Sequence, residues 1–188
     1  MRIISGSLKG KKILDPKDIQ TRPLKDLTKE SIFNIIAHSN KFKINIKDSN
    51  ILDLFSGVGS FGIECLSRNA KKVVFMENYN GVLPILKKNL NNLRLINDYE
   101  IIEKNIYAFD ALTNFNESFD IIFIDPPYKD KNLINILTTI AENKVLNKNG
   151  IIIIHRHKND EIIVPNNLKK IEEKKYGISK IFFLLNLN

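Results

Sequence analysis

The stretch DPPY, residues 125–128, directly follows the apolar run FDIIFI at residues 119–124. Folding alone gives no reason to end a buried strand with a carboxylate, two prolines and an aromatic ring. Asp125 and the carbonyl of Pro126 can each accept one N–H of an amino group on a nucleic-acid base, which stabilises positive charge growing on that nitrogen. Pro126 and Pro127 stiffen the corner and remove competing N–H donors, and Tyr128 can stack on the base. The pattern predicts a grip on a flipped or single-stranded base, with these four residues as the catalytic set; the simpler interpretation is a proline-rich turn.

A glycine loop, DLFSGVGSFG at residues 53–62, lies between a predicted strand and a predicted helix. Gly57, Gly59 and Gly62 match GxGxxG, which also occurs in dinucleotide sites and, more plainly, in tight strand-to-helix turns. Asp53 repels a pyrophosphate but suits a ligand with an ammonium group, and S-adenosylmethionine has a cationic amino-acid end and no phosphate. The predicted cofactor-binding residues of this loop are Asp53, Phe55, Ser56, Gly57 and Gly59.

The ends of the next two predicted strands carry further candidates for the cofactor. Glu77 and Asn78 follow KVVFM, and an acid at this place can accept both hydroxyls of a ribose. Asn105 and Ile106 follow the third strand, where an amide can bond the edge of adenine and an isoleucine can cover its ring. The alternatives are a solvated strand-end acid for Glu77 and an ordinary polar turn for Asn105 and Ile106.

Apolar runs alternate with helical stretches from residue 50 onward. The runs NILDLF, KVVFME, YEIIEKN, FDIIFID and GIIIIHR predict strands covered on both faces, with helices over about 60–69, 82–92 and 132–146. This alternation predicts an α/β doubly wound parallel sheet, and residues 168–187 predict a hairpin at one edge, joined at Tyr176–Gly177. Before residue 50 we expect two short strands within 2–14, a helix within 24–39 and a polar linker at 40–49.

Composition narrows the class of protein. The single cysteine, Cys65, excludes an intrachain disulfide and a cysteine-based metal cluster, and its helix position suggests a core residue. The N-terminus lacks a signal-peptide pattern and no apolar run is long enough to span a bilayer, so we expect a cytoplasmic protein. The net charge is +8, and residues 1–30 hold eight basic and four acidic residues. A basic N-terminal segment favours a polyanionic partner, although lysine is frequent throughout the chain.

The motifs together resemble those of bacterial 16S ribosomal RNA guanine-N2 methyltransferases, which are class I S-adenosylmethionine-dependent enzymes. The resemblance rests on MRIISGSLKGKKI, on TRPLKDLTKESIFNII, on the glycine loop with DPPY, and on the closing YG-S---F, and it covers essentially the whole chain. It implies a Rossmann-like seven-stranded sheet, six strands parallel and one antiparallel, with an N-terminal hairpin and helix at residues 1–40 and a catalytic domain at 41–188. It also places Thr21, Arg22 and Pro23 near the cofactor or the substrate entrance. The proposed chemistry requires no metal, and we expect a monomer.

Three positions depart from the pattern of that family. Leu24 follows Pro23 where a threonine is usual, Asn105 stands where an aspartate is frequent, and His155 stands where a glutamate is expected. For His155 and His157 a solvated strand end is the favoured interpretation over a proton relay.

The basic N-terminal residues are the predicted contacts with 16S ribosomal RNA in the small subunit, because phosphate contacts supply affinity without sequence information. They are Arg2, Lys9, Lys11, Lys12, Arg22 and Lys25. Three alternatives remain open: a DNA adenine-N6 methyltransferase, which lacks support because no insert for reading a DNA sequence is present; a catalytically inactive RNA-binding module; and a nicotinamide-dependent oxidoreductase.

Overall fold

The computed structural model describes residues 1–17, 21, 24–94, 98–108, 110–113, 115 and 117–187. Within these residues, no helix is both long enough and apolar enough to cross a membrane. The basic residue Arg22 and its neighbour Pro23 lie outside the described residues, so their predicted roles stay predictions.

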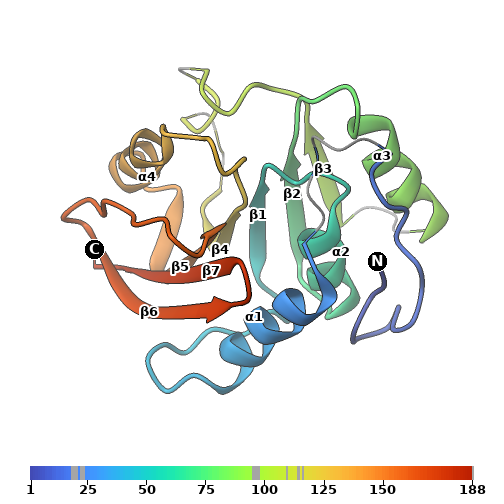
Figure 1. Cartoon of the computed structure of the whole chain (residues 1–188), viewed down its shortest axis with the longest axis horizontal. Helices are drawn as coiled ribbons and strands as arrows, with labels where there is room; N and C mark the ends of the chain where they lie inside the picture. Colours follow the sequence, from blue (N-terminus) through green and yellow to red (C-terminus); the bar gives the residue numbers. More distant parts are fainter. Residues whose placement is uncertain are drawn as a thin grey trace.

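The strands are β1 Asn50–Leu54, β2 Lys72–Met76, β3 Tyr99–Ile102, β4 Phe119–Ile124, β5 Leu146–His157, β6 Leu168–Tyr176 and β7 Ser179–Asn186. They form one sheet in the order β3-β2-β1-β4-β5-β7-β6, drawn in Figure 1. Strand β7 is antiparallel to its neighbours β5 and β6, and the other pairs are parallel. The predicted doubly wound sheet, six strands parallel and one antiparallel, is confirmed. The strand order reverses between β1 and β4, the place where such sheets bind ligands.

Helices cover both faces of the sheet. They are α1 Asp26–His38, α2 Ser60–Ser67, α3 Leu83–Asn92 and α4 Leu133–Glu142. Neighbouring residues of a strand point to opposite faces, so Phe123 joins the apolar cluster under α1, α2 and α3, whereas Ile122 joins the cluster under α4. Figure 1 shows α4 on the other side of the sheet from α2. Cys65 is fully buried in the first cluster, as predicted.

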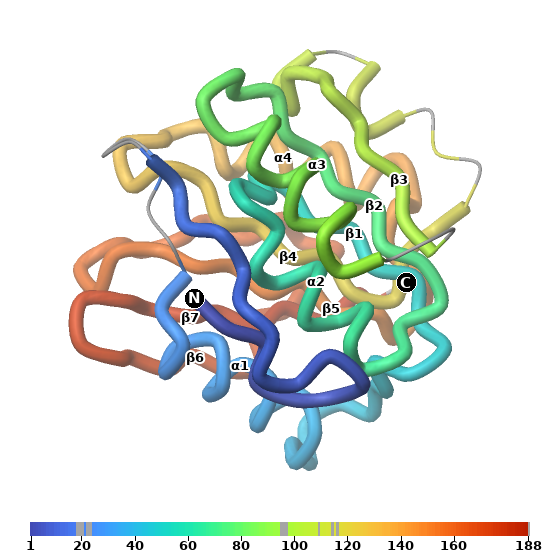
Figure 2. Tube along the Cα trace, turned by 90° about the vertical axis from the view of Figure 1, so that its right-hand side faces the viewer, coloured from blue at the N-terminus to red at the C-terminus, as the bar shows by residue number. Residues whose placement is uncertain are grey.

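The N-terminal segment folds back on itself but does not form the two regular strands that we expected. Its single bridge joins Arg2 to Lys12. The turn instead bonds to the end of α2, where the N–H of Ser7 donates to the carbonyl of Ser67 at 2.7 Å. A Cβ on Gly6, which has φ +84°, would lie 1.8 Å from the same carbonyl oxygen, so this close approach requires glycine. Figure 2 shows the segment, in blue, running over the side of the sheet that carries α2.

A buried ion pair attaches this segment to α2. The Nζ atom of Lys29 lies 3.4 Å from Oε2 of Glu64, and both side chains are fully buried. The Glu64 carboxylate also accepts the N–H groups of Ile4 at 2.8 Å and Ser5 at 2.9 Å, and Nε–H of Arg68 at 3.0 Å. We call Lys29, Glu64 and Arg68 the Lys29–Glu64 network. It fixes the N-terminal segment to the helix that begins at the glycine loop.

The expectation of a polar linker at residues 40–49 was wrong. Phe42 and Ile46 are buried in the core, and the Phe42 ring stacks on Phe183 of β7 with 5.9 Å between ring centroids. The apolar residues of this segment are too few for a recognisable period, so only contacts with a strand far along the chain reveal their burial.

Candidate functional site: a carboxylate corner at the strand ends

Two carboxylates stand at the ends of neighbouring strands. Strands β1 and β4 are paired so that Leu54 lies opposite Ile124, and the N–H of Asp125 lies 3.4 Å from the carbonyl oxygen of Leu54. Asp53 and Asp125 therefore meet at the point where the strand order reverses. Together with Glu77, at the end of β2, they make up what we call the carboxylate corner.

Asp53 is the most buried member of the corner, with 1% of its surface exposed. Its Oδ2 atom accepts the N–H of Gly62 at 3.0 Å, whereas its Oδ1 atom, equally buried, has no hydrogen-bond partner among the described residues. Burial raises the pKa of Asp53 well above its usual value; the Gly62 N–H opposes that rise, and the charges of Asp125 and Glu77 add to it. A buried acceptor without a donor, surrounded by negative charge, is suited to a cationic group of a ligand.

The glycine loop bends sharply between β1 and α2. Phe55 has φ +57°, which is rare for a residue with a side chain, and Gly57 and Gly59 have φ +57° and +85°. The hydroxyl of Ser56 donates to the carbonyl of Asp53 at 2.6 Å and so closes the turn. A Cβ on Gly62 would lie 2.3 Å from the Phe75 ring, so the third glycine of the motif permits close packing of α2 on the sheet.

Glu77 fixes the loop from the neighbouring strand. One carboxylate oxygen accepts the N–H of Gly57 at 2.9 Å, and the other accepts the N–H groups of Asn78 and Tyr79 at 2.9 and 2.8 Å. A carboxylate has about four lone-pair positions. The three bonds therefore leave about one lone-pair position on Glu77 for a ribose hydroxyl. From the sequence we expected Glu77 to accept hydrogen bonds from both ribose hydroxyls. The side chain is buried, so the expected alternative of a solvated acid is wrong.

The turn after β3 contains Asn105 and Ile106. The side-chain oxygen of Asn105 accepts the N–H of Tyr107 at 3.0 Å, which is the polar-turn arrangement, and its exposed amide remains the predicted adenine contact. Ile106 is buried. Tyr107 packs near Phe55, with 6.0 Å between ring centroids, and its hydroxyl donates to Asp130. Burial, with this bond, raises the pKa of Tyr107. The Tyr107–Asp130 bond links the loops after β3 and β4, and no pattern in the sequence indicated it.

His155 lies against the corner and not in solvent, so the favoured interpretation of its position was wrong. Only 2% of its surface is exposed. The Nδ1 atom lies 3.0 Å from Oδ1 of Asp125, and Nε2 lies 2.8 Å from Oγ of Ser179 on β7. His157 is half-buried, and its ring centroid lies 5.2 Å from that of Tyr128. Strand β7 pairs with the end of β5, which buries His155 and leaves His157 partly exposed.

Arg156 holds the loop that contains DPPY. Its Nη1 atom donates to the carbonyl of Pro127 at 3.0 Å, and its Nη2 atom donates to the carbonyls of Tyr128 and Asp130 at 3.0 and 2.9 Å. Pro126 is buried, whereas Pro127 is exposed and Tyr128 is half-buried. Arg156 was missed in the sequence because nothing local distinguishes it from other arginines, and its acceptors are backbone carbonyls of another loop.

The predicted RNA-binding residues that the structure describes lie in the N-terminal turn and just before α1. Arg2, Lys9, Lys11, Lys12 and Lys25 are all exposed. Lys9 lies in the turn that contacts the end of α2, a helix of eight residues and thus about 12 Å from the glycine loop at its start. Thr21 lies at the loop itself, since a Cβ on Gly57 would be 3.6 Å from its Cγ2 atom. Lys25 immediately precedes α1.

Comparisons with known proteins show the family to which the chain is similar. A family model described as "Conserved hypothetical protein 95" matches residues 1–185. The chain is 34% identical to "Ribosomal RNA small subunit methyltransferase D" of Haemophilus influenzae, over 95% of this chain and 90% of the relative. It is 36% identical to the protein of the same name from Buchnera aphidicola, over 92% and 86% of the two chains.

A solved structure is similar over nearly the whole length. It is described as "Putative methyltransferase yhhF from Escherichia coli", with a TM-score of 0.83, 27% sequence identity, and coverage of 99% of this chain and 97% of the other. The similarity therefore includes the N-terminal segment as well as the sheet.

Proposed function

The chain belongs to the family described as Conserved hypothetical protein 95, and from this premise we propose that it methylates the exocyclic N2 amine of a guanine in 16S ribosomal RNA of the small subunit. The methyl donor and cofactor is S-adenosylmethionine. The observation that carries the proposal is the carboxylate corner: a buried, unpaired oxygen of Asp53 beside the Asp125 carboxylate, at the ends of neighbouring strands. The relatives named ribosomal RNA methyltransferases support the RNA substrate.

The cofactor is held by the glycine loop and by the ends of the first three strands. Asp53 Oδ1 accepts the ammonium group of the cofactor, which would satisfy its buried, unpaired position. Glu77 accepts one ribose hydroxyl with its remaining lone pair while its other bonds hold the loop. Phe55, Ser56, Gly57 and Gly59 shape the bend against which the cofactor lies, and Asn78, Asn105 and Ile106 complete the nucleoside side. The cofactor supplies an electrophilic methyl group on sulfur.

The target amine is gripped by the corner after β4. Asp125 accepts one N–H and the carbonyl of Pro126 accepts the other, so that the lone pair of the nitrogen points at the methyl group. The nitrogen–carbon bond would form as the sulfur–carbon bond of the cofactor breaks and its thioether leaves. The two acceptors would stabilise the positive charge that grows on the nitrogen, which would then lose one proton to solvent. Tyr128 stacks on the base, and the prolines keep the corner rigid. A guanine within a helix cannot enter, so the target nucleotide is single-stranded or flipped out.

The two proposed roles, RNA contact and catalysis, belong to successive parts of the chain. Residues 1–40 supply phosphate contacts through Arg2, Lys9, Lys11, Lys12, Arg22 and Lys25, and residues 41–188 supply the catalytic domain. Because α2 separates Lys9 from the glycine loop by about 12 Å, the hairpin contacts RNA some distance from the modified nucleotide. The protein acts as a monomer in the cytoplasm, without a metal.

One experiment tests the reaction and its substrate. Purified protein is incubated with labelled S-adenosylmethionine and one of three acceptors: small ribosomal subunits from cells that lack this activity, naked 16S RNA, or DNA. Label in ribosomal RNA, followed by digestion to nucleosides that yields N2-methylguanosine, supports the proposal. Label at another position of a ribosomal nucleoside would contradict the N2 assignment. Label found in DNA alone would replace the proposal with the second candidate, an adenine-N6 methyltransferase, since DPPY serves that chemistry too.

A further inference from the structure

The end of β5 contacts the loop after β4 with two consecutive side chains. His155 and Arg156 are 2% and 6% exposed. Consecutive residues of a strand point to opposite faces, yet both side chains reach residues 125–130. His155 bonds to the side chain of Asp125, and Arg156 bonds to backbone carbonyls further along the loop. The two contacts therefore hold different parts of the loop at residues 125–130.

The His155 ring is bonded at both nitrogens, which fixes its orientation. With Asp125 ionised, Nδ1 carries the proton that is donated to the carboxylate at 3.0 Å, and Nε2 accepts the hydroxyl proton of Ser179 at 2.8 Å. Ser179 is buried, and it is paired with His157 in the β5–β7 register. A ring that is held on both sides and donates to a carboxylate sets the plane of that carboxylate, as partners behind the ligands of a metal site do.

Arg156 uses its guanidinium in a way that lysine cannot reproduce. Its two terminal nitrogens donate to the three carbonyls of Pro127, Tyr128 and Asp130, and its Nε atom lies 3.0 Å from Oδ2 of Asp160. The planar fork of arginine can satisfy several acceptors in fixed directions, whereas an ammonium group is a point charge on a flexible stem. The bonds fix the backbone on the far side of Pro126, the residue whose carbonyl grips the amine.

We propose that the end of β5 is the anchor of the amine-gripping loop, with His155 orienting the Asp125 carboxylate and Arg156 fixing the backbone from Pro127 to Asp130. Both are positioning residues, because they act through Asp125 and Pro126 and do not touch the base. The inference rests on the proposed function, and it goes beyond it by assigning His155 and Arg156 roles in the transfer step.

The kinetic test compares conservative and non-conservative replacements. His155→Asn keeps an N–H near the place of Nδ1, and His155→Ala removes it. A displacement of about 1 Å at the reacting groups can lower a rate about 100-fold. We expect His155→Ala to lower kcat by about 10- to 100-fold, with the affinity for S-adenosylmethionine and the KM for RNA unchanged, and His155→Asn to stay within about 5-fold of the wild type. His38→Asn, an exposed histidine on α1, is the matched control and keeps full activity.

Arg156 is tested in the same assay. Arg156→Lys keeps the charge but not the fork, so we expect a lower kcat and an unchanged cofactor affinity. A purely structural role would lower the melting temperature and leave kcat per folded molecule intact. The anchor is overturned by His155→Ala with wild-type kcat, by equal losses in His155→Ala and His155→Asn, or by Arg156→Lys with wild-type kcat.

A second measurement is independent of the substrate and so separates this inference from the proposed function. Proton NMR of the wild type should show a downfield Nδ1 proton of His155, because it is bonded to a carboxylate. The signal should disappear in Asp125→Ala and persist in His38→Asn. Persistence in Asp125→Ala would overturn the orienting bond, whichever acceptor the enzyme methylates. If no acceptor takes label from the wild type, the proposed function fails while this spectrum still decides the contact.

Discussion

Two groups of buried charged side chains have opposite arrangements of charge. The Lys29–Glu64 network lies on the side of the sheet that carries α2, and the carboxylate corner lies at the ends of the strands. In the Lys29–Glu64 network, charges of opposite sign meet, and Glu64 accepts three N–H donors in addition to its contact with Lys29. In the carboxylate corner, three acids face one another and one oxygen of Asp53 has no partner among the described residues. The first arrangement is complete within the described residues, whereas we propose that the second is completed by the ammonium group of the cofactor. The difference separates a group that holds the fold from a group that binds a ligand.

The pKa directions express the same contrast. Burial lowers the pKa of Lys29, but Glu64 and Asp26 oppose that shift. Burial raises the pKa of Asp53, and the neighbouring acids Asp125 and Glu77 reinforce it. Neighbours that oppose the effect of burial stabilise the charged form, and neighbours that reinforce it leave the charge unfavourable until a ligand arrives.

The largest effect is expected in the Lys29–Glu64 network. Glu64→Gln keeps the shape but leaves the Lys29 ammonium buried without a counter-charge, and breaking a buried pair in this way typically costs about 3–5 kcal/mol. We expect a loss of that size in the free energy of unfolding, measured with urea. The double replacement Lys29→Met with Glu64→Gln removes both charges but keeps an acceptor oxygen for the amides of Ile4 and Ser5, so it should recover part of the loss. A change of less than about 1 kcal/mol in the free energy of unfolding of Glu64→Gln would mean that the network does not stabilise the fold.

The next effect is expected at the other group and in the reaction instead of the fold. Asp125→Ala removes one of the two proposed acceptors of the amine, and the loss of one such group typically lowers kcat by about 100- to 1000-fold. The protein should still fold and bind the cofactor, with a melting temperature lowered modestly because the buried His155 loses its bond to Asp125. Asp15→Ala, whose exposed carboxylate bonds only to the N-terminal amine in the described structure, is the control with full activity. If Asp125→Ala did not fold, Asp125 would have a structural role like that of the Lys29–Glu64 network, and the distinction between the two groups would be wrong.

A smaller effect is expected in cofactor binding, through its dependence on pH. The raised pKa of Asp53 means that the folded protein without ligand keeps this proton to higher pH than the unfolded chain does, so Asp53 contributes less to stability as pH rises towards its folded pKa. The ammonium of the cofactor favours the ionised form. Affinity for S-adenosylmethionine should therefore rise with pH and level off above the raised pKa.

The variant Asp53→Asn isolates this contribution. Calorimetry between about pH 5 and about pH 8 should show affinity lower than in the wild type by about 10-fold, or about 1.4 kcal/mol, at the upper end. The slope with pH should be absent, and the melting temperature without ligand should be equal or higher, because a buried charge has been removed. An unchanged pH slope in Asp53→Asn would assign the dependence to another group.

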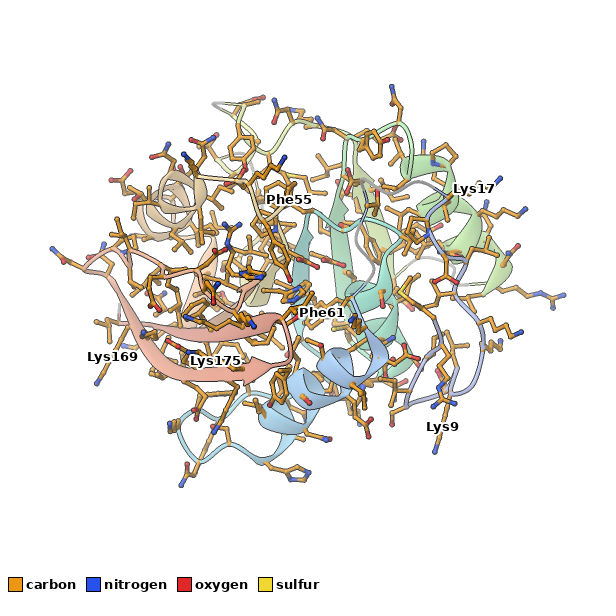
Figure 3. The ribbon with its side chains drawn as sticks, in the orientation of Figure 1. Lys9, Lys17, Phe55, Phe61, Lys169 and Lys175 are labelled. Carbon is orange, nitrogen blue, oxygen red and sulfur yellow. The ribbon has the colours of Figure 1, made fainter. Side chains whose placement is uncertain are left out.

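The smallest effect is expected on the surface beside the Lys29–Glu64 network. Lys9→Gln removes one predicted phosphate contact, which should reduce the slope of log affinity for RNA against log salt concentration by about 1 and leave cofactor binding alone. Lys169→Gln makes the same change of charge on β6, and Figure 3 shows the two lysines on opposite sides of the molecule. Equal slopes for the two variants would mean that the N-terminal turn does not contact RNA.

Most of the sheet was predictable because its strands are apolar runs separated by helical periods. The hairpin at Tyr176–Gly177 and the positions of α2, α3 and α4 follow from local patterns in the same way. The errors share one physical cause, namely contacts between residues distant in the sequence. Phe42 is buried by Phe183, and His155 is enclosed by Ser179. No local pattern records either contact.

The same distinction between local patterns and distant contacts applies to the charged residues. Asp53 and Asp125 were accessible to sequence reasoning because they end recognisable strands. Glu64 was not, because a glutamate within an apolar helix has no local feature that reveals the amides of Ile4 and Ser5 as its partners. Arg156 was missed for the same reason, since its three acceptors are backbone carbonyls of another loop.

The position of β7 has a consequence for how the chain matures. This strand comes later in the sequence than every other strand, yet it lies inside the sheet, between β5 and β6. During vectorial synthesis, β5 therefore emerges before β7, the strand that pairs with its outer edge. Because Ser179 of β7 bonds to His155, a nascent chain halted before residue 179 lacks one of the two contacts that hold the His155 ring.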